Sequence, residues 1–326
     1  MKSIQYLLLS LFLWMHIEGG LTYRDGWLVS TDVLPTMTAE EHYKTGLDAL
    51  ECKDWNIAAK NFYIVTYNFP TSPHYSDSAF NLGVSYYQME ELYEANQAFT
   101  TYLESQSHPA RFEEAIWYKL EIADAFRCGA LRRPFGLKQL PKWMPSRSTA
   151  YEIYNDIISA MPCSDYAANA LCSKAWLLWC DADFRSAIDT YQLFIRRFPK
   201  HELTPECYLA INQIYLDQCR CEYQNPDIIA YAEINTLKLK QAFPRSEFCP
   251  QAELLVLCIK EEYANGLYET GRLYERKCEP GASIFYYVST IKQFPETCSA
   301  EWARERLRIL DCDMLYQIEP PSARDA

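Results

Sequence analysis

The stretch that decides the fold is GLDALECKDWNIAAKNFYIVTYNFP, residues 46–70. It contains a small residue at Gly46, a second small residue at Ala58, an aromatic ring at Phe62 and a closing Pro70, separated by residues that mostly favour a helix. A small residue on each of two successive helices lets their backbones approach where they cross, and the ring one turn later fills the space towards a neighbour. The stretch therefore predicts two packed helices that end at the proline.

The same spacing recurs along the chain. Counted from the first small residue, the second small residue stands 12 positions later, the aromatic ring 16 and the proline 24. The copies, some of which keep only one helix or lack the proline, are Gly46, Ala58, Phe62 and Pro70; Gly83, Ala95 and Phe99; Ala150, Tyr154 and Pro162; Ala175, Ala187, Tyr191 and Pro199; Ala232, Thr236 and Pro244; and Gly271, Ser283, Tyr287 and Pro295. Six helix pairs are expected, because an irregular helical bundle would not repeat these offsets.

Proline marks the ends of these pairs. Proline disfavours helix in the residue before it, and a Ser or Thr two positions later suits the start of the next helix. The sites are Phe69-Pro70 with Ser72, Met161-Pro162 with Ser164, Phe198-Pro199, Phe243-Pro244 with Ser246, and Phe294-Pro295 with Thr297. The end of one pair and the start of the next are thus encoded together.

These patterns predict an all-α protein, a solenoid in which each helix pair covers the apolar surface of its neighbour. The small residues, the aromatic and the closing proline resemble the tetratricopeptide repeat, whose consensus is about 34 residues long. The resemblance covers about residues 39–316, with an insertion at about 128–147 inside the third pair and a smaller one at 219–227 in the fifth. Residues 250–278 are predicted to form one long helix, and residues 300–315 a C-terminal capping helix.

The N-terminal residues 1–20 have the features of an export signal. Lys2 supplies a positive start, residues 4–17 are almost unbroken apolar, and Gly19 is a small residue suited to cleavage. The alternative is an uncleaved membrane anchor, because Glu18 stands where a small residue is preferred. We expect the body of the protein outside the cytoplasm, with a flexible linker over 21–38 and a disordered tail over 317–326.

The composition excludes several classes of function. The 326 residues include 31 basic and 43 acidic side chains, and the net charge of −12 argues against nucleic-acid binding. The 13 cysteines show no disulfide framework, and the one close pair, Cys219 and Cys221, has no histidine beside it, so no metal site is predicted. With no nucleophile elbow, phosphate loop or dinucleotide motif, we expect no enzyme, no catalytic residues and no cofactor.

Aromatic and apolar side chains recur at the inner-face positions of the first helices. An exposed groove of this kind suits an extended polypeptide, because rings supply a large contact area at low entropy cost. The alternative for any single ring is that it packs between neighbouring helices. The predicted groove residues are Tyr43, Leu47, Phe80, Val84, Tyr87, Trp176 and Trp179, and the last repeat instead carries Arg272, Glu275 and Arg276, which suit docking of a polar partner.

The insertion in the third pair concentrates positive charge on an acidic protein. It contains six basic residues and no acid between positions 127 and 147, together with three prolines and several apolar residues. We interpret it as a docking loop for an acidic partner or an anionic membrane surface, the alternative being solvated surface. The candidate residues are Arg132, Arg133, Lys138, Lys142 and Trp143.

An export signal, repeats closed by Phe-Pro-x-Ser, a long third-repeat insertion and a long helix before the last repeat together resemble the BamD family, also called ComL or YfiO. Its members are lipoproteins that assemble β-barrels in the outer membrane. The resemblance is closest at residues 261–307, which contain Tyr268-Glu269-Thr270-Gly271-Arg272-Leu273-Tyr274-Glu275-Arg276 and Phe294-Pro295-Glu296-Thr297.

The resemblance implies a non-catalytic scaffold that is exported to the periplasm and associated with the inner face of the outer membrane. In such a scaffold the N-terminal repeats receive unfolded outer-membrane protein precursors, and the C-terminal repeats dock on a BamA-like insertase beside other subunits of the assembly complex. In this chain the first role would belong to the groove of repeats one and two, and the second to Arg272 and Arg276. The first cysteine is Cys52, inside the first repeat, so attachment is expected through an uncleaved signal helix or through partners.

Two alternatives remain, one within scaffolds and one in a different class of function. A periplasmic repeat scaffold resembling CpoB, also called YbgF, would coordinate cell-wall synthesis with envelope constriction. An enzyme acting on envelope polymers would need paired carboxylates or a metal in a cleft, and the sequence identifies neither.

Overall fold

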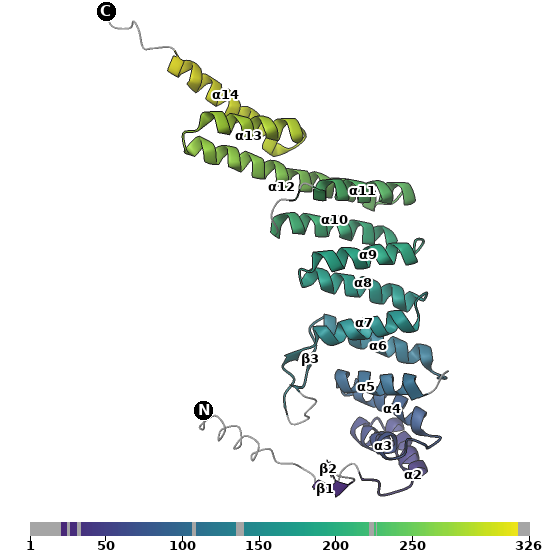
Figure 1. Ribbon diagram of the computed structural model, residues 1–326. Coiled ribbons are helices and arrows are strands. Elements are labelled where there is room, and N and C mark those ends of the chain that lie inside the picture. The colour runs from purple at the N-terminus through teal and green to yellow at the C-terminus, as the bar shows by residue number, and fades with distance from the viewer. Residues whose placement is uncertain are drawn as a thin grey trace, which may run out of the picture. The chain divides into compact units, whose positions relative to one another are not determined.

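The computed structural model describes residues 21–24, 27–30, 34–105, 109–134, 140–221, 225 and 227–318. Within them the chain is an all-α array of helices, apart from two short strand pairs (Figure 1). Residues up to Ser173 form one compact unit and residues from Lys174 a second. The predicted export signal lies outside the described residues, as do residues 319–326 of the predicted tail.

The helices form the six predicted pairs. In chain order they are α2 (Ala39–Glu51) with α3 (Trp55–Asn68), α4 (Tyr75–Gln88) with α5 (Leu92–Ser105), α6 (Phe112–Arg127) with α7 (Arg147–Ala160), α8 (Asp165–Cys180) with α9 (Phe184–Arg197), α10 (Thr204–Cys221) with α11 (Asp227–Ala242), and α12 (Phe248–Arg276) with α13 (Pro280–Gln293). The long helix α12 and the capping helix α14 (Cys298–Ile318) stand where the sequence predicts them. Within each unit successive helices contact one another from α2 to α7 and from α9 to α14, which is the neighbour-to-neighbour packing of a repeat array.

The small residues of the first helices lie where the sequence predicts, at close contacts with the second helices. A Cβ atom built on Gly46 would approach the Phe62 ring to 2.7 Å, and one built on Gly83 would approach Phe99 to 2.7 Å. Phe62 and Phe99 are fully buried. A ring packed directly on helix backbone leaves no room for a side chain, so glycine is required at these positions.

In four of the pairs, the turn between the two helices is built on a left-handed residue that is not glycine, whereas α6 of the third pair is followed by Gly129 with a φ of 101°. Lys53, Glu90, Ala182 and Cys278 have φ between 58° and 59°, and each stands seven positions after the small residue of its repeat. The next residue then donates its N–H to the carbonyl five residues earlier, as Asp54 does to Ala49 at 2.8 Å. This Schellman-type ending satisfies the last carbonyls of the first helix and turns the chain directly into the second.

The prolines end the second helices as predicted. Phe69, Met161, Phe198 and Phe294, each directly before a proline, are the C-cap residues of α3, α7, α9 and α13. Two of the predicted starting residues cap the next helix with their hydroxyl oxygens. The Ser164 oxygen accepts from the N–H of Ala167 at 3.3 Å, and the Thr297 oxygen from that of Ala300 at 3.3 Å.

The segment predicted as a flexible linker contains regular structure that the sequence did not lead us to expect. Strand β1 (Leu21–Arg24) pairs antiparallel with β2 (Trp27–Ser30). Just before α2, the backbone N–H groups of Thr36 and Met37 donate to Nε2 of His42, each at 3.3 Å. The other ring nitrogen of this buried histidine lies 2.8 Å from Oδ1 of Asn61. Through His42, these hydrogen bonds hold residues 36–37 against the first repeat.

We predict that Gly83→Ala lowers the free energy of unfolding by about 1–3 kcal/mol, because the added methyl would overlap Phe99 in a packed core. The matched control is Gly281→Ala at the start of α13, where nothing lies within 4 Å, and it should leave stability unchanged or raise it slightly. Adding Phe99→Leu should recover part of the loss. Chemical denaturation measures the free energy of unfolding of all three variants. Equal effects of the two glycine substitutions would contradict the close packing of Phe99 on Gly83.

Candidate functional site

Four of the predicted groove residues lie half-buried on the first two repeats. Tyr43 of α2 stacks on His74 with ring centroids 4.5 Å apart, and Tyr87 of α4 meets Tyr118 of α6 edge to face at 5.1 Å. Leu47 and Val84 lie one position after the glycine of their repeats and keep part of their surface in solvent. Burial raises the pKa of the Tyr87 hydroxyl, and so does the charge of Glu121, so the ring stays neutral.

Phe80 is wrong as a groove residue. Its side chain is only 2% exposed, and it packs edge to face against Phe99 and Tyr102 at 5.6 and 5.1 Å. The guanidinium of Arg111 covers its ring at 4.8 Å from the centroid. In the second repeat, the position three residues before the glycine thus faces the neighbouring helices. The alternative reading, a ring packed between helices, is the correct one for Phe80.

Tyr118 is a contact residue that the sequence analysis missed. It stacks on Phe99 with a centroid distance of 4.9 Å and an interplanar angle of 10°, and it also touches Tyr87. Tyr118 stands five positions before Ala123, outside the offsets that define the groove, so the repeat pattern carried no signal for it.

An open hollow of about 660 Å³ lies in the first unit beside the start of α6. Its side chains combine rings and charges, among them Arg111, Glu114, Trp117 and Tyr166, and Trp117 is 42% exposed. Mixed charge and aromatic surface suits a polypeptide segment better than a small apolar ligand.

The two predicted tryptophans belong to the second unit and differ in their surroundings. Trp176 is 40% exposed. Trp179 is half-buried, and its indole N–H donates to Oδ2 of Asp217 on α10 at 2.9 Å. This bond fixes the orientation of Trp179, so Trp176 is the larger contact surface of the two.

Glu275 is wrong as a docking residue, because it holds the capping helix. Its carboxylate accepts a hydrogen bond from the Tyr287 hydroxyl at 2.7 Å and forms an ion pair with Arg306 of α14. Burial opposes ionisation of this carboxyl, but the hydrogen bonds from Arg306 and Tyr287 outweigh it and hold the pKa of Glu275 below its usual value. Burial, and then the hydrogen bond with Glu275 and its charge, raise the pKa of Tyr287 to about 12.

The other two predicted docking residues remain at the surface. Arg272 is paired with Glu269 one turn earlier at 3.0 Å, and both side chains are about half exposed. Arg276, the last residue of α12, is exposed. Of the three, Arg276 is the charge that stays available to a partner.

The basic insertion folds back onto its own chain. Strands β3 (Leu131–Arg132) and β4 (Met144–Pro145) pair antiparallel at its base. Arg133 donates to Glu91 at 2.8 Å, and Lys142 lies 3.5 Å from the same carboxylate. Burial opposes ionisation of Glu91, but Arg133 and Lys142 outweigh it and lower the pKa of this carboxyl.

Three of the cations named for the predicted docking loop are engaged within the chain. Arg133 and Lys142 are bound to Glu91, and the Arg132 guanidinium lies over the Tyr93 ring at 5.1 Å. Lys138 lies outside the described residues. Trp143 remains 60% exposed at the base of the hairpin and, among the residues of this loop that the structure describes, is the side chain best placed for a contact.

Among the described residues, no group of three or more His, Cys, Asp or Glu side chains is arranged to hold a metal ion. None of their helices combines the length and apolar composition that a membrane span requires.

Comparison with known proteins gives one family match. The model of the family YfiO, described as outer membrane lipoprotein, matches residues 35–173 and 136–312. No curated protein matches the chain. Among solved structures, a tetratricopeptide repeat protein from Parabacteroides merdae is 15% identical with a TM-score of 0.35, over 83% of this chain and 98% of that one. A TPR repeats protein from Bacteroides fragilis is 10% identical with a TM-score of 0.40, over 84% and 100%, respectively.

We predict that Glu91→Gln frees the basic hairpin, because it removes the charge that binds Arg133 and Lys142. Tryptic cleavage within residues 128–146 should become about fivefold faster, the factor that corresponds to roughly 1 kcal/mol of lost local stability. The control is Glu90→Gln, since Glu90 binds Lys142 through its backbone carbonyl and not through its side chain. Equal cleavage rates in both variants, measured by mass spectrometry, would show that Glu91 does not anchor the hairpin.

We predict that Glu275→Gln lowers the free energy of unfolding by roughly 1 kcal/mol at neutral pH through the loss of charged hydrogen bonds. The folded-state pKa of Glu275 is lowered, so its contribution is present above the unfolded pKa of about 4.3 and is lost as pH falls through the folded value. The difference in the free energy of unfolding between wild type and variant, measured from denaturation curves, should therefore disappear in acid.

The control for this experiment is Glu269→Gln, which removes only the exposed pair with Arg272 and should change stability by a few tenths of a kcal/mol at most. A gap for Glu275→Gln that stays constant from neutral to acid pH would contradict the role of its charge.

Proposed function

The chain belongs to the YfiO family of outer membrane lipoproteins, and from that membership we propose that it is a non-catalytic scaffold of the machinery that assembles β-barrels in the outer membrane. The observation that carries the proposal is the extent of the match, which runs from residue 35 to residue 312 and so includes all six helix pairs and most of the capping helix. The scaffold would act in the periplasm at the inner face of the outer membrane.

In this proposal the first unit receives unfolded outer-membrane protein precursors. Tyr43, Leu47, Val84 and Tyr87 offer half-buried apolar surface on α2 and α4, and the hollow beside Trp117 adds charged groups. Such a surface binds extended chain with little demand on its sequence, because rings give contact area and the backbone of the bound segment stays hydrated. In the second unit, Trp176 would serve the same kind of contact.

Docking on a BamA-like insertase and the other assembly subunits would use the last repeat. Glu275 and Tyr287 are engaged with each other and, through Arg306, with the capping helix, so the exposed cation Arg276 carries the docking role in the proposal. A charge at the rim of an interface favours association with an acidic partner surface. The exposed Trp143 of the basic hairpin would contribute the membrane-surface contact.

We predict that Arg276→Glu abolishes co-purification of the insertase from detergent-solubilised envelopes, because a charge reversal places like charges against each other at the contact. The control is Arg308→Glu, which makes the same charge change at an exposed residue of α14 paired only with Glu305. Retention of the insertase by Arg276→Glu would refute this docking site. Recovery of cell-wall synthesis proteins by the wild-type chain, with no insertase, would refute the assembly function itself.

A further inference from the structure

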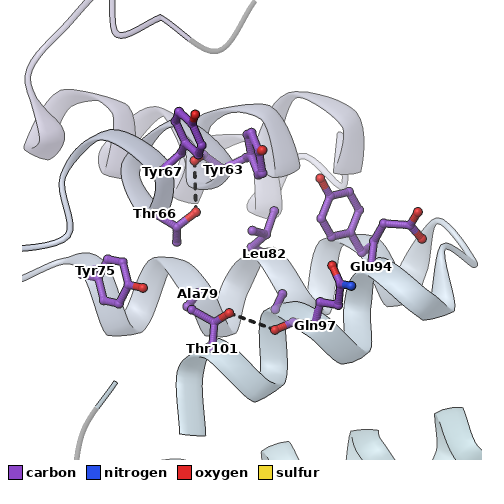
Figure 2. Close-up of a pocket in the computed structure, with 11 residues that line it drawn as sticks. Tyr63, Thr66, Tyr67, Tyr75, Ala79, Leu82, Glu94, Gln97 and Thr101 are labelled. Atoms are coloured by element: carbon purple, nitrogen blue, oxygen red, sulfur yellow. Dashed lines mark hydrogen bonds between the residues drawn. The ribbon is translucent and has the colours of Figure 1, made fainter. Parts of the chain in front are cut away.

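A second recessed site lies in the first unit, away from the groove. It is a pocket of about 310 Å³ formed by α3, α4 and α5 (Figure 2). Its inner surface includes the buried side chains of Ala79, Leu82 and Ala98. Tyr63 and Tyr67 of α3 form one wall, with their rings stacked 5.9 Å apart and 38% and 55% exposed.

The pocket opens on the side of α4 opposite to the groove. The α4 residues that line it, Tyr75, Ala79, Leu82 and Tyr86, recur at intervals of four, three and four and therefore share one helical face. The groove residue Val84 falls about half a turn away from that face, and Tyr87 about a third of a turn away. The two sites can thus bind separate ligands.

The pocket carries one formal charge. Glu94 of α5 contributes a carboxylate, and no lysine, arginine or histidine lines the site. Among the described residues, this carboxylate joins no ion pair within 4 Å. Arg133 is close enough to interact with the charge of Glu94, but its guanidinium is hydrogen-bonded to Glu91 and to the Leu140 carbonyl. The site therefore offers tyrosine faces and one uncompensated negative charge.

We propose that this pocket binds the arginine side chain of an extended polypeptide. A guanidinium stacks on tyrosine rings by cation–π attraction and pairs with a carboxylate through two parallel N–H groups. The aliphatic stem of arginine would lie against Ala79, Leu82 and Ala98, as long charged side chains do on apolar surface.

Other ligand classes fit less well. A purely apolar side chain would bury Glu94 without a partner, which costs free energy. An anion would meet the carboxylate with like charge. The proposal goes beyond the assembly function and does not depend on it, because it uses a different face of the repeats and a different chemistry.

The test is a fluorine NMR titration of the full chain with the peptide trifluoroacetyl-Gly-Ser-Arg-Ser-Gly-amide. The matched peptide has citrulline, the neutral isostere, in place of arginine. The arginine peptide should bind roughly 3- to 30-fold more tightly than the citrulline peptide, the range that cation–π and charge contacts give. Glu94→Gln should remove most of this difference, and Tyr67→Ala should weaken the arginine peptide by a similar factor.

Two variants control for net charge and for the loss of an exposed ring. Glu104→Gln makes the same charge change at an exposed position of α5 that does not line the pocket, and Tyr231→Ala removes a ring that is 50% exposed on α11. Neither should alter binding. Equal affinity for arginine and citrulline peptides, or an arginine preference that survives Glu94→Gln, would overturn the proposal. Displacement of the peptide by phosphoethanolamine at a lower concentration than by free arginine would overturn it too, in favour of a lipid headgroup.

Discussion

The contact on which the repeats depend is an aromatic ring of the second helix laid against the bare backbone of the first. Gly46, Gly83 and Gly271 meet Phe62, Phe99 and Tyr287 in this way, and all three rings are fully buried. A glycine inside a helix costs about 1 kcal/mol relative to alanine, whereas burying a large ring contributes about 1.5–3 kcal/mol. The ring contact outweighs the cost of the glycine, and it also fixes how closely the two helices of a pair approach.

This contact explains why so much of the fold can be read from spacing alone. The offset of 16 joins a glycine and a ring that touch, and the offset of 24 marks the proline directly after the C-cap residue of the second helix, so the spacing predicts the helix pairs. The turns inside the pairs are different. Their left-handed residues are Lys53, Glu90, Ala182 and Cys278, and none is the glycine that usually marks such a backbone. The geometry there is imposed by the packed helices on either side, at a cost of roughly 1–2 kcal/mol per residue, and it leaves no signature in residue type.

The partners of charged side chains are the second feature that the sequence alone predicted poorly. An acidic residue follows each of these left-handed residues. The side chains of Asp54 and Asp183 cap the second helix, because their carboxylates accept hydrogen bonds from the N–H groups of Ile57 and Ser186. In the second repeat the corresponding Glu91 instead binds the basic hairpin of the third repeat. Pairing across repeats depends on which side chains the fold brings together, so a cluster of cations in the sequence could not reveal that its partner was on the same chain.

The burial of individual rings shows which positions of the first helices face the core, a distinction that the sequence did not make. Three repeats carry an aromatic ring three positions before the small residue. Phe80 and Tyr268 are buried and pack against rings of neighbouring helices, whereas Tyr43 of the first repeat is half-buried. In the second and last repeats that position therefore belongs to the core, and in the first repeat it keeps surface for a contact.

The residues one and four positions after the small residue remain at or near the surface, and their chemistry changes from repeat to repeat. They are Leu47 and Leu50, Val84 and Tyr87, Asp124 and Arg127, Trp176 and Trp179, and Arg272 and Glu275. Asp124 binds Arg127 of its own helix, and Glu275 binds Arg306. The third and last repeats thus satisfy much of their charge internally. A bound polypeptide would gain the most from desolvation at the aromatic and aliphatic positions, which are those of the first and second repeats in the first unit and, separately, those of the fourth repeat in the second unit.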